Sequence, residues 1–152
     1  IDPSLKGMGT TVSMVTLARH MAFWGHVGDS RIYLYRDGEF KQISVDHTIV
    51  QVLLEKGKIT EEEAMDHPQC HVLTRAVGVD ENLVVDSGAF EVQPKDRILI
   101  CSDGLTSFIQ KQELYDAIGD YRRTEREIIN DLFARVYENG AKDNITAILT
   151  TI

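Results

Sequence analysis

Cysteine is scarce in this chain, and long apolar runs are missing. Only two of the 152 residues are cysteines, Cys70 and Cys101, and they form no Cys-x-x-Cys or other close pair. This spacing argues against a disulfide scaffold, and no segment resembles a signal peptide or a membrane span. A reducing cytoplasm is therefore the simplest location, and a hydrophobic content of 43% is enough to give one domain a buried core.

Basic residues are also in short supply. The chain has 16 Lys and Arg residues against 24 Asp and Glu residues, which gives a formal net charge of -8 at pH 7. Such a balance opposes non-specific binding to nucleic acid or to an anionic membrane, so neither partner is expected. It suits a cleft that binds cations, although many ordinary domains are equally acidic.

The residues that are present alternate between strand-like and helix-like patterns. Runs rich in β-branched and aromatic residues predict strands at 11–17, 21–27, 32–35, 39–43, 82–85, 89–92, 97–101 and from 144 onward. Asp37-Gly38 is a type I′ hairpin signal between two of these runs. The strands lie in hairpins and the longer helices come late, which predicts an α+β domain with antiparallel sheets and not a βαβ arrangement.

Helical signals fall in two places. Apolar spacing and capping residues predict helices at 48–56, from 60 to about 67, at 110–118 and at 124–138. Thr60 with Glu63, and Thr124 with Glu127, have the spacing of a capping box. Gly57 and Gly119 are expected to end the helices that they follow.

Two acidic strings carry the clearest chemical signal: Cys101-Ser102-Asp103-Gly104 and Lys142-Asp143-Asn144-Ile145-Thr146. Asp103 follows the apolar run 97–101, and Asp143 precedes the apolar run 146–152, so two strand ends could aim two carboxylates into one cleft. Mg²⁺ and Mn²⁺ prefer oxygen ligands in octahedral arrangement. The strings therefore predict a hard-metal site for hydrolytic chemistry that needs no Cys or His ligand.

Single motifs also allow three other interpretations. The string Gly28-Asp29-Ser30-Arg31 resembles an esterase nucleophile block, but no Asp-x-x-His follows near the C-terminus, and a polar turn is the simpler interpretation. The string His67-Pro68-Gln69-Cys70-His71 offers three zinc ligands, but Pro68 prevents a helical His spacing and a fourth ligand is not evident. Asp103 could be the nucleophile of a haloacid dehalogenase-type phosphatase, but Cys101 replaces the first aspartate of that class.

Six motifs taken together favour one family. They occur in the order Gly7-Met8-Gly9-Thr10-Thr11, Val27-Gly28-Asp29-Ser30-Arg31, Asp46-His47-Thr48, Leu73-Thr74-Arg75-Ala76-Val77-Gly78, Cys101-Ser102-Asp103-Gly104-Leu105 and Asp143-Asn144-Ile145-Thr146. In this order and spacing they resemble the PP2C (PPM) family of metal-dependent protein serine/threonine phosphatases, over nearly the whole chain. Residues 46–78 look like the flap subdomain of the bacterial members, which are typically paired with transmembrane serine/threonine kinases.

The resemblance implies an α-β-β-α sandwich with a dinuclear Mn²⁺ or Mg²⁺ centre at one edge of two antiparallel sheets. By similarity, Asp103 and Asp143 are ligands of the second metal, and Asp29 with Asp103 helps to hold the third metal of bacterial members. A metal-bridging hydroxide would attack phosphoserine or phosphothreonine in line, without a covalent phospho-enzyme. Arg31 is interpreted as structural, and His47 as a core or surface residue. The expected partners are phosphoprotein substrates of a cognate kinase.

The chain departs from the family pattern at its beginning. It opens on Ile1-Asp2-Pro3-Ser4, and Gly7-Met8-Gly9 lacks the preceding aspartate that bridges the two metals in the family. Residues 1–152 are therefore expected to be the C-terminal two-thirds of a phosphatase domain, inactive alone and prone to self-association through exposed sheet surface. The alternative is a non-catalytic phosphatase-like module that binds a partner. Three converging carboxylates favour the enzyme, because a binding module has no physical need for them.

Overall fold

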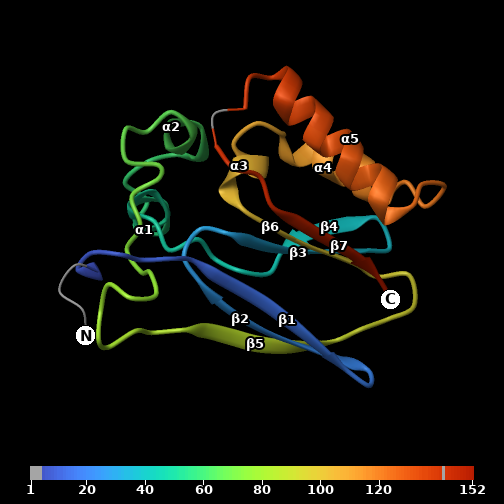
Figure 1. Cartoon of the computed structure of the whole chain (residues 1–152), viewed down its shortest axis with the longest axis horizontal. Helices are drawn as coiled ribbons and strands as arrows, with labels where there is room; N and C mark the ends of the chain where they lie inside the picture. Colours follow the sequence, from blue (N-terminus) through green and yellow to red (C-terminus); the bar gives the residue numbers. More distant parts are fainter. Residues whose placement is uncertain (1–4, 142) are drawn as a thin grey trace.

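Two antiparallel sheets lie face to face, and the longer helices cover the outer side of one of them (Figure 1). The computed structural model describes residues 5–141 and 143–152, so the opening Ile1-Asp2-Pro3-Ser4 and Lys142 lie outside the described residues. One sheet has the strand order β1-β2-β5 and the other the order β4-β3-β6-β7. Each neighbouring pair is antiparallel, which confirms the predicted α+β class.

Most elements follow the chain in the order that the sequence patterns predict, with small shifts of boundary. The strands are β1 (Val12–Ala18), β2 (Met21–Val27), β3 (Arg31–Arg36), β4 (Glu39–Gln42), β5 (Asp86–Glu91), β6 (Arg97–Cys101) and β7 (Ala147–Thr151). The helices are α1 (Ile49–Glu55), α2 (Glu61–Met65), α3 (Asp103–Thr106), α4 (Lys111–Gly119) and α5 (Glu125–Glu138). Asp37 and Gly38 both have positive φ, as the predicted type I′ hairpin requires.

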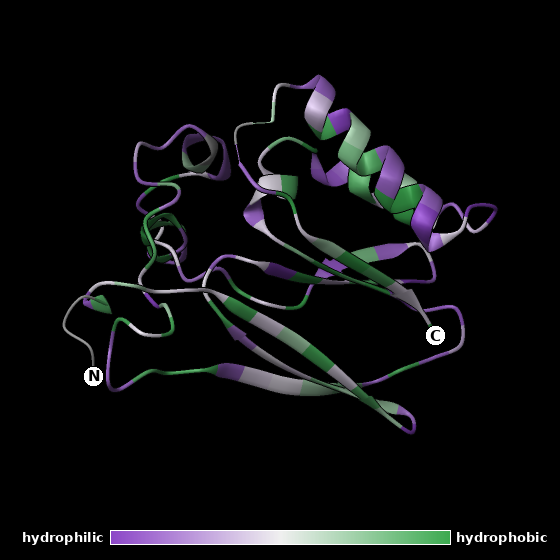
Figure 2. Cartoon of the chain, viewed as in Figure 1, coloured by the Kyte–Doolittle hydropathy of each residue, from purple (hydrophilic) through white to green (hydrophobic). Residues whose placement is uncertain are grey.

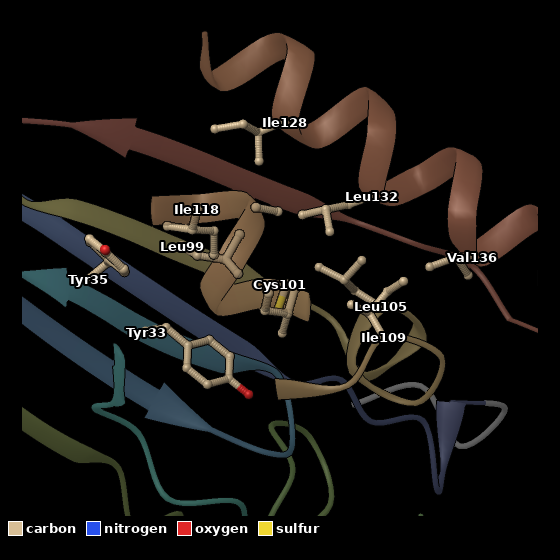
Figure 3. Packing of buried hydrophobic residues seen from close by; sticks show 12 residues of the cluster. Tyr33, Tyr35, Leu99, Cys101, Leu105, Ile109, Ile118, Ile128, Leu132 and Val136 are labelled. Carbon is tan, nitrogen blue, oxygen red and sulfur yellow. The ribbon is translucent and has the colours of Figure 1, made fainter. Parts of the chain in front are cut away.

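Strands β3 and β6 are buried on both faces because they form the middle of the molecule. Alternate residues point toward the three-stranded sheet, where they form a cluster of Ala22, Ile32, Leu34 and Ile98. The residues between them point toward the helices, where Tyr33, Leu99 and Cys101 belong to a larger cluster (Figure 3). Period-two alternation thus places one apolar layer between the sheets and a second under the helices.

Helix α5 supplies the cover of the larger cluster. Ile128, Leu132 and Val136 form its apolar stripe, and each of their side chains is 0% exposed (Figure 3). The helix begins at the predicted capping box, in which the Thr124 N–H donates to Glu127 Oε2 at 2.8 Å and the Glu127 N–H donates to Thr124 Oγ1. The capping box therefore fixes where α5 begins, and the packing of its apolar stripe fixes which face is buried.

The outer face of the three-stranded sheet is apolar and uncovered by any helix among the described residues. Met14 and Phe23 point outward on this face and are 55% and 49% exposed. Figure 2 shows apolar bands along β1, on the sheet that lies farther from the helices. The described chain thus supplies three layers, a helical layer and two sheets, of the expected α-β-β-α arrangement.

Two predictions of local structure are wrong. Residues 82–85 do not form a strand: Asp80 accepts the Asn82 N–H in a turn, Val84 is 60% exposed, and β5 begins only at Asp86. Conversely, α3 begins at Asp103, where the sequence patterns predict no helix. Within the described residues, no helix has the length and apolar character needed to cross a membrane.

Truncation of Leu132 tests the packing under α5. Leu132→Ala should lower the free energy of unfolding by about 2–5 kcal/mol, because it removes a fully buried side chain and leaves a cavity. Tyr137→Ala on the same helix is the control, since Tyr137 is 66% exposed and should change the stability little. Urea unfolding of both variants provides the measurement, and equal effects would contradict this description of the core.

Candidate metal centre

Strand pairing brings three acidic loops to the same end of the four-stranded sheet. Arg31 pairs with Cys101, and Cys101 pairs with Ala147, across three neighbouring strands. Asp29 lies just before β3, Asp103 just after β6, and Asp143 shortly before β7. Because neighbouring strands run in opposite directions, the start of β3, the end of β6 and the start of β7 meet at one edge.

The segments that carry Asp103 and Asp143 are held against each other by their backbones. The Ser102 N–H donates to the Thr146 carbonyl at 2.9 Å, and the Thr146 N–H donates to Ser102 Oγ at 3.0 Å. A side chain on Gly104 would overlap the carbonyl oxygen of Asn144, so only glycine allows this close approach. The loop before β7 therefore has a fixed position relative to the start of α3.

Asp29 and Asp103 are electrostatically coupled. Burial and the negative charge of Asp103 raise the pKa of the Asp29 carboxyl above its ordinary value, and Asp46 adds to this effect while Arg31 opposes it. Asp29 and Asp103 are both only partly exposed, so water screens this repulsion incompletely. A bound cation would neutralise two carboxylates that otherwise repel each other.

The donor set suits a hard cation, but it is incomplete within this chain. Asp29 and Asp103 offer carboxylate oxygens, which Mn²⁺ and Mg²⁺ prefer. Asp143 is exposed, and its Oδ1 accepts the N–H of Asn144 at 2.7 Å. In the part of the chain that the structure describes, no three His, Cys, Asp or Glu side chains form a group that could hold a metal ion. The edge thus brings Asp29 and Asp103 together and leaves Asp143 beside them.

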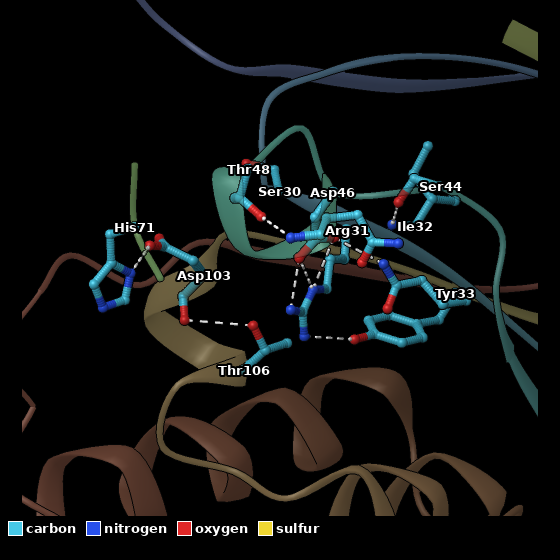
Figure 4. A network of polar contacts seen from close by, with 12 residues as sticks. Ser30, Arg31, Ile32, Tyr33, Ser44, Asp46, Thr48, His71, Asp103 and Thr106 are labelled. Atoms are coloured by element: carbon cyan, nitrogen blue, oxygen red, sulfur yellow. Dashed lines mark hydrogen bonds and ion pairs between the residues drawn. The ribbon is translucent and has the colours of Figure 1, made fainter. Parts of the chain in front are cut away.

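Arg31 is engaged in an ion pair and does not face the acidic edge as a free cation. Its Nε and Nη2 atoms donate to Asp46 at 2.8 and 2.6 Å, and Nη1 lies 3.4 Å from the Tyr33 hydroxyl (Figure 4). Burial is the largest single effect and opposes the charged form, but the hydrogen bonds and negative charge of Asp46, together with Tyr33, outweigh it and hold the pKa of Arg31 above its ordinary value. These contacts agree with the structural role predicted for Arg31.

The segment expected to be a flap is connected to the acidic edge by a side chain. The Ile49 N–H donates to the Val72 carbonyl and the Thr74 N–H to the His47 carbonyl, so the two ends of the segment lie side by side. His71 Nδ1 lies 3.6 Å from Asp103 Oδ2 (Figure 4). The sequence patterns place His71 only in a candidate zinc cluster, whereas in the structure it contacts Asp103.

The comparisons with known proteins agree with this arrangement over almost the whole chain. The family model described as protein phosphatase 2C matches residues 2–150. The serine/threonine phosphatase stp of Listeria monocytogenes serovar 1/2a is 37% identical over 148 residues, which cover 97% of this chain and 58% of that protein. The phosphatase PhpP of Streptococcus pneumoniae strain R6 is 35% identical over 153 residues, with coverages of 99% and 61%.

Solved structures give the same result. The serine/threonine phosphatase PstP/Ppp of Mycobacterium tuberculosis superposes with a TM-score of 0.92 at 36% identity, covering 99% of this chain and 63% of that chain. Stp1 of Staphylococcus aureus superposes with a TM-score of 0.93 at 32% identity, covering 99% and 59%. A PstP catalytic domain in complex with two manganese ions has a TM-score of 0.85 at 34% identity and coverages of 97% and 60%.

The chain thus has two facing antiparallel sheets, an acidic edge and a helical side segment. This combination is the architecture of two-sheet phosphatase domains. The chain belongs to the protein phosphatase 2C family. It spans 58–61% of the length of the curated relatives named above.

Neutralisation of Asp29 tests the electrostatic coupling at this edge. In chelator and at pH 7, Asp29→Asn should raise the free energy of unfolding, because it removes the partly buried charge and its repulsion with Asp103, which together raise the pKa of Asp29. A raised pKa in the folded state means that stability is lost as the pH rises through that pKa, so the gain should shrink as the pH is lowered and Asp29 becomes protonated. Asp116→Asn, on the exposed side of α4, is the matched control. Lower stability of Asp29→Asn at pH 7 would contradict the coupling.

Proposed function

We propose that the protein containing this chain is a metal-dependent protein serine/threonine phosphatase that hydrolyses phosphoserine and phosphothreonine. The observation that carries this proposal is the sheet edge where Asp29, Asp103 and Asp143 lie next to the ends of three neighbouring strands of a protein phosphatase 2C fold. The relatives and solved structures are described as serine/threonine phosphatases or, for PhpP, as a protein phosphatase, which favours an enzyme over a non-catalytic binding module.

The proposed site divides the carboxylates between two metals. Asp103 and Asp143 would be ligands of one Mn²⁺ or Mg²⁺ ion, and Asp29 with Asp103 would help to hold a further ion. Bound divalent ions supply a nucleophile from water at neutral pH and neutralise charge on a transferring phosphoryl group. The task of this chain is then to fix its carboxylates in position, through the pairing of β3, β6 and β7 and the close contact at Gly104.

Residues 1–152 would form part of one phosphatase domain, with residues 46–78 as its flap. The isolated chain would be inactive, since the residues that the structure describes contain no complete group of metal ligands. The partners of the whole protein would be phosphoproteins, including those phosphorylated by a cognate serine/threonine kinase in bacterial signalling. A cytoplasmic location agrees with the free thiols of Cys70 and Cys101.

Removal of Asp143 tests the proposed catalysis. In the full-length protein, Asp143→Ala should lower the rate of phosphopeptide hydrolysis at least about 100-fold and raise the Mn²⁺ concentration required, because a metal ligand is lost. Asp116→Ala is the control, because it removes an exposed carboxylate on α4. Phosphate release is measured over a series of Mn²⁺ and Mg²⁺ concentrations. An unchanged rate and an unchanged metal requirement in Asp143→Ala would refute the assignment of this residue.

We further propose that the 152-residue chain self-associates through the outer face of the three-stranded sheet. Met14 and Phe23 are about half exposed on this face, and β1 and β5 are edge strands with unpaired backbone groups. An apolar face beside free strand edges promotes association between chains.

The replacement of both outward side chains tests the self-association. The double variant Met14→Thr with Phe23→Thr should shift sedimentation of the chain toward monomer, because it makes the exposed face polar. Tyr137→Thr, which changes a residue on α5 that is 66% exposed, should leave the association unchanged. Sedimentation over a range of concentrations distinguishes these cases. A chain that already remains monomeric at high concentration would contradict the proposal.

A further inference from the structure

His47 lies buried between the loop that carries Asp29 and the start of β5. Its side chain is 5% exposed, and its Nδ1 lies 3.1 Å from the backbone nitrogen of Gly28. The backbone adds a second connection, because the His47 N–H donates to the Gly28 carbonyl at 2.7 Å. On the other side of the ring, Nε2 lies 3.1 Å from Asp86 Oδ2. His47 therefore contacts both polar groups of Gly28 and one carboxylate of β5.

These contacts determine which ring nitrogen carries the proton. The backbone N–H of Gly28 can only donate, so Nδ1 of His47 must be the unprotonated acceptor. Nε2 then carries the hydrogen and donates it to Asp86. The hydrogen bond with His47, together with Arg75, holds the pKa of Asp86 below its ordinary value, which keeps this acceptor ionised. Arg75 Nη1 also donates to Asp86 Oδ1 at 2.7 Å. Because Nε2 of His47 carries a hydrogen in this tautomer, the 3.1 Å approach of Nη1 to Nε2 is a contact between two donors and not a hydrogen bond.

The conformation of Gly28 makes this contact important for Asp29. Gly28 has a φ of +112°, and any side chain there would overlap Thr11. Gly28 thus adopts a backbone conformation that few residues allow, and its N–H and carbonyl need partners because the residue is buried. His47 supplies both partners.

His47 also lies where the two ends of the flap segment meet. Its carbonyl accepts the Thr74 N–H at 2.8 Å, and Arg75, the next residue, forms the ion pair with Asp86. The loop of Asp29 and the base of the segment 46–78 therefore share one buried side chain. A displacement of the imidazole would therefore change the position of the Asp29 loop and of the base of the segment 46–78.

We propose that His47 is a positioning residue, which fixes the Gly28 peptide so that Asp29 faces Asp103 in the geometry that binds a cation. The proposal rests on the proposed function, because it assumes that Asp29 helps to hold a metal ion. His47 touches neither substrate nor metal in this role. It acts through the backbone, as partners of metal ligands commonly do.

Two substitutions separate the two ends of the imidazole. In His47→Asn the amide oxygen can take the place of Nδ1 and accept the Gly28 N–H, while the contact with Asp86 is lost. In His47→Gln the longer side chain can keep the contact with Asp86, while the Gly28 N–H loses its acceptor. The backbone bond between residues 47 and 28 remains available in both variants, so they form a matched pair.

The variants are made in the full-length protein and compared with Asp29→Asn by calorimetric titration with Mn²⁺ and by amide exchange at Gly28. His47→Gln should weaken the Mn²⁺ site that Asp29→Asn weakens, by about 10-fold or more, and should expose the Gly28 amide to exchange. His47→Asn should stay within about threefold of the unchanged protein in Mn²⁺ affinity and should keep the amide protected. A role in stability alone would not produce this difference between Asn and Gln.

The outcomes separate the positioning role from the metal site. If Asp29→Asn weakens Mn²⁺ binding and His47→Gln does not, the positioning role is refuted and the metal site stands. If neither weakens it, Asp29 is no metal ligand and both proposals fail. One measurement needs no variant: the ¹⁵N shifts of the His47 ring in the unchanged protein should report a neutral imidazole with Nδ1 unprotonated. A proton on Nδ1 would overturn the proposal even if His47→Gln failed to fold.

Discussion

The antiparallel pairing of β3, β6 and β7 is the constraint on which the acidic edge depends. Each strand contributes one carboxylate from the loop at the same end, and the register from Arg31 to Cys101 to Ala147 sets the separation of these loops. Both faces of the central strands are covered by apolar residues, so the register cannot shift by one residue without exchanging the two layers. The core thus fixes where the charges lie, although it contains none of them.

The acidic edge is stabilised by its surroundings and not by its own charges. Asp29 and Asp103 repel each other, whereas Asp46 is paired with Arg31 and Asp86 with Arg75. Among the described residues, the carboxylates paired with an arginine, Asp46 and Asp86, are thus distinct from the carboxylates at the edge, Asp29 and Asp103, which form no ion pair with Lys or Arg. The second kind is typical of sites that receive a cation from solution. His71 and His47 connect this edge to the segment 46–78, one through Asp103 and the other through Gly28.

Local signals in the sequence predicted most elements. The features that the sequence did not predict depend on contacts between residues far apart in the chain. The capping boxes at Thr60 and Thr124 and the turn at Asp37-Gly38 depend on neighbouring residues, and all three are confirmed. Gly119 was expected to follow the helix and end it, but it is the last residue of α4, where a side chain would lie 2.7 Å from the Tyr35 hydroxyl. The family motifs identified the three aspartates, but the contacts of His47 join residues 28, 47 and 86, which no local pattern connects.

The close approach of Gly104 to Asn144 has an evolutionary consequence. Gly104 is not itself a member of the clusters beneath α5 and between the sheets, so a methyl group at this position would act first on the separation of the two acidic loops. A lineage could in this way lose its chemistry and keep its architecture. Glycine at this position is then a steric requirement of the site, and a relative with a larger residue here would have to hold its two acidic loops farther apart.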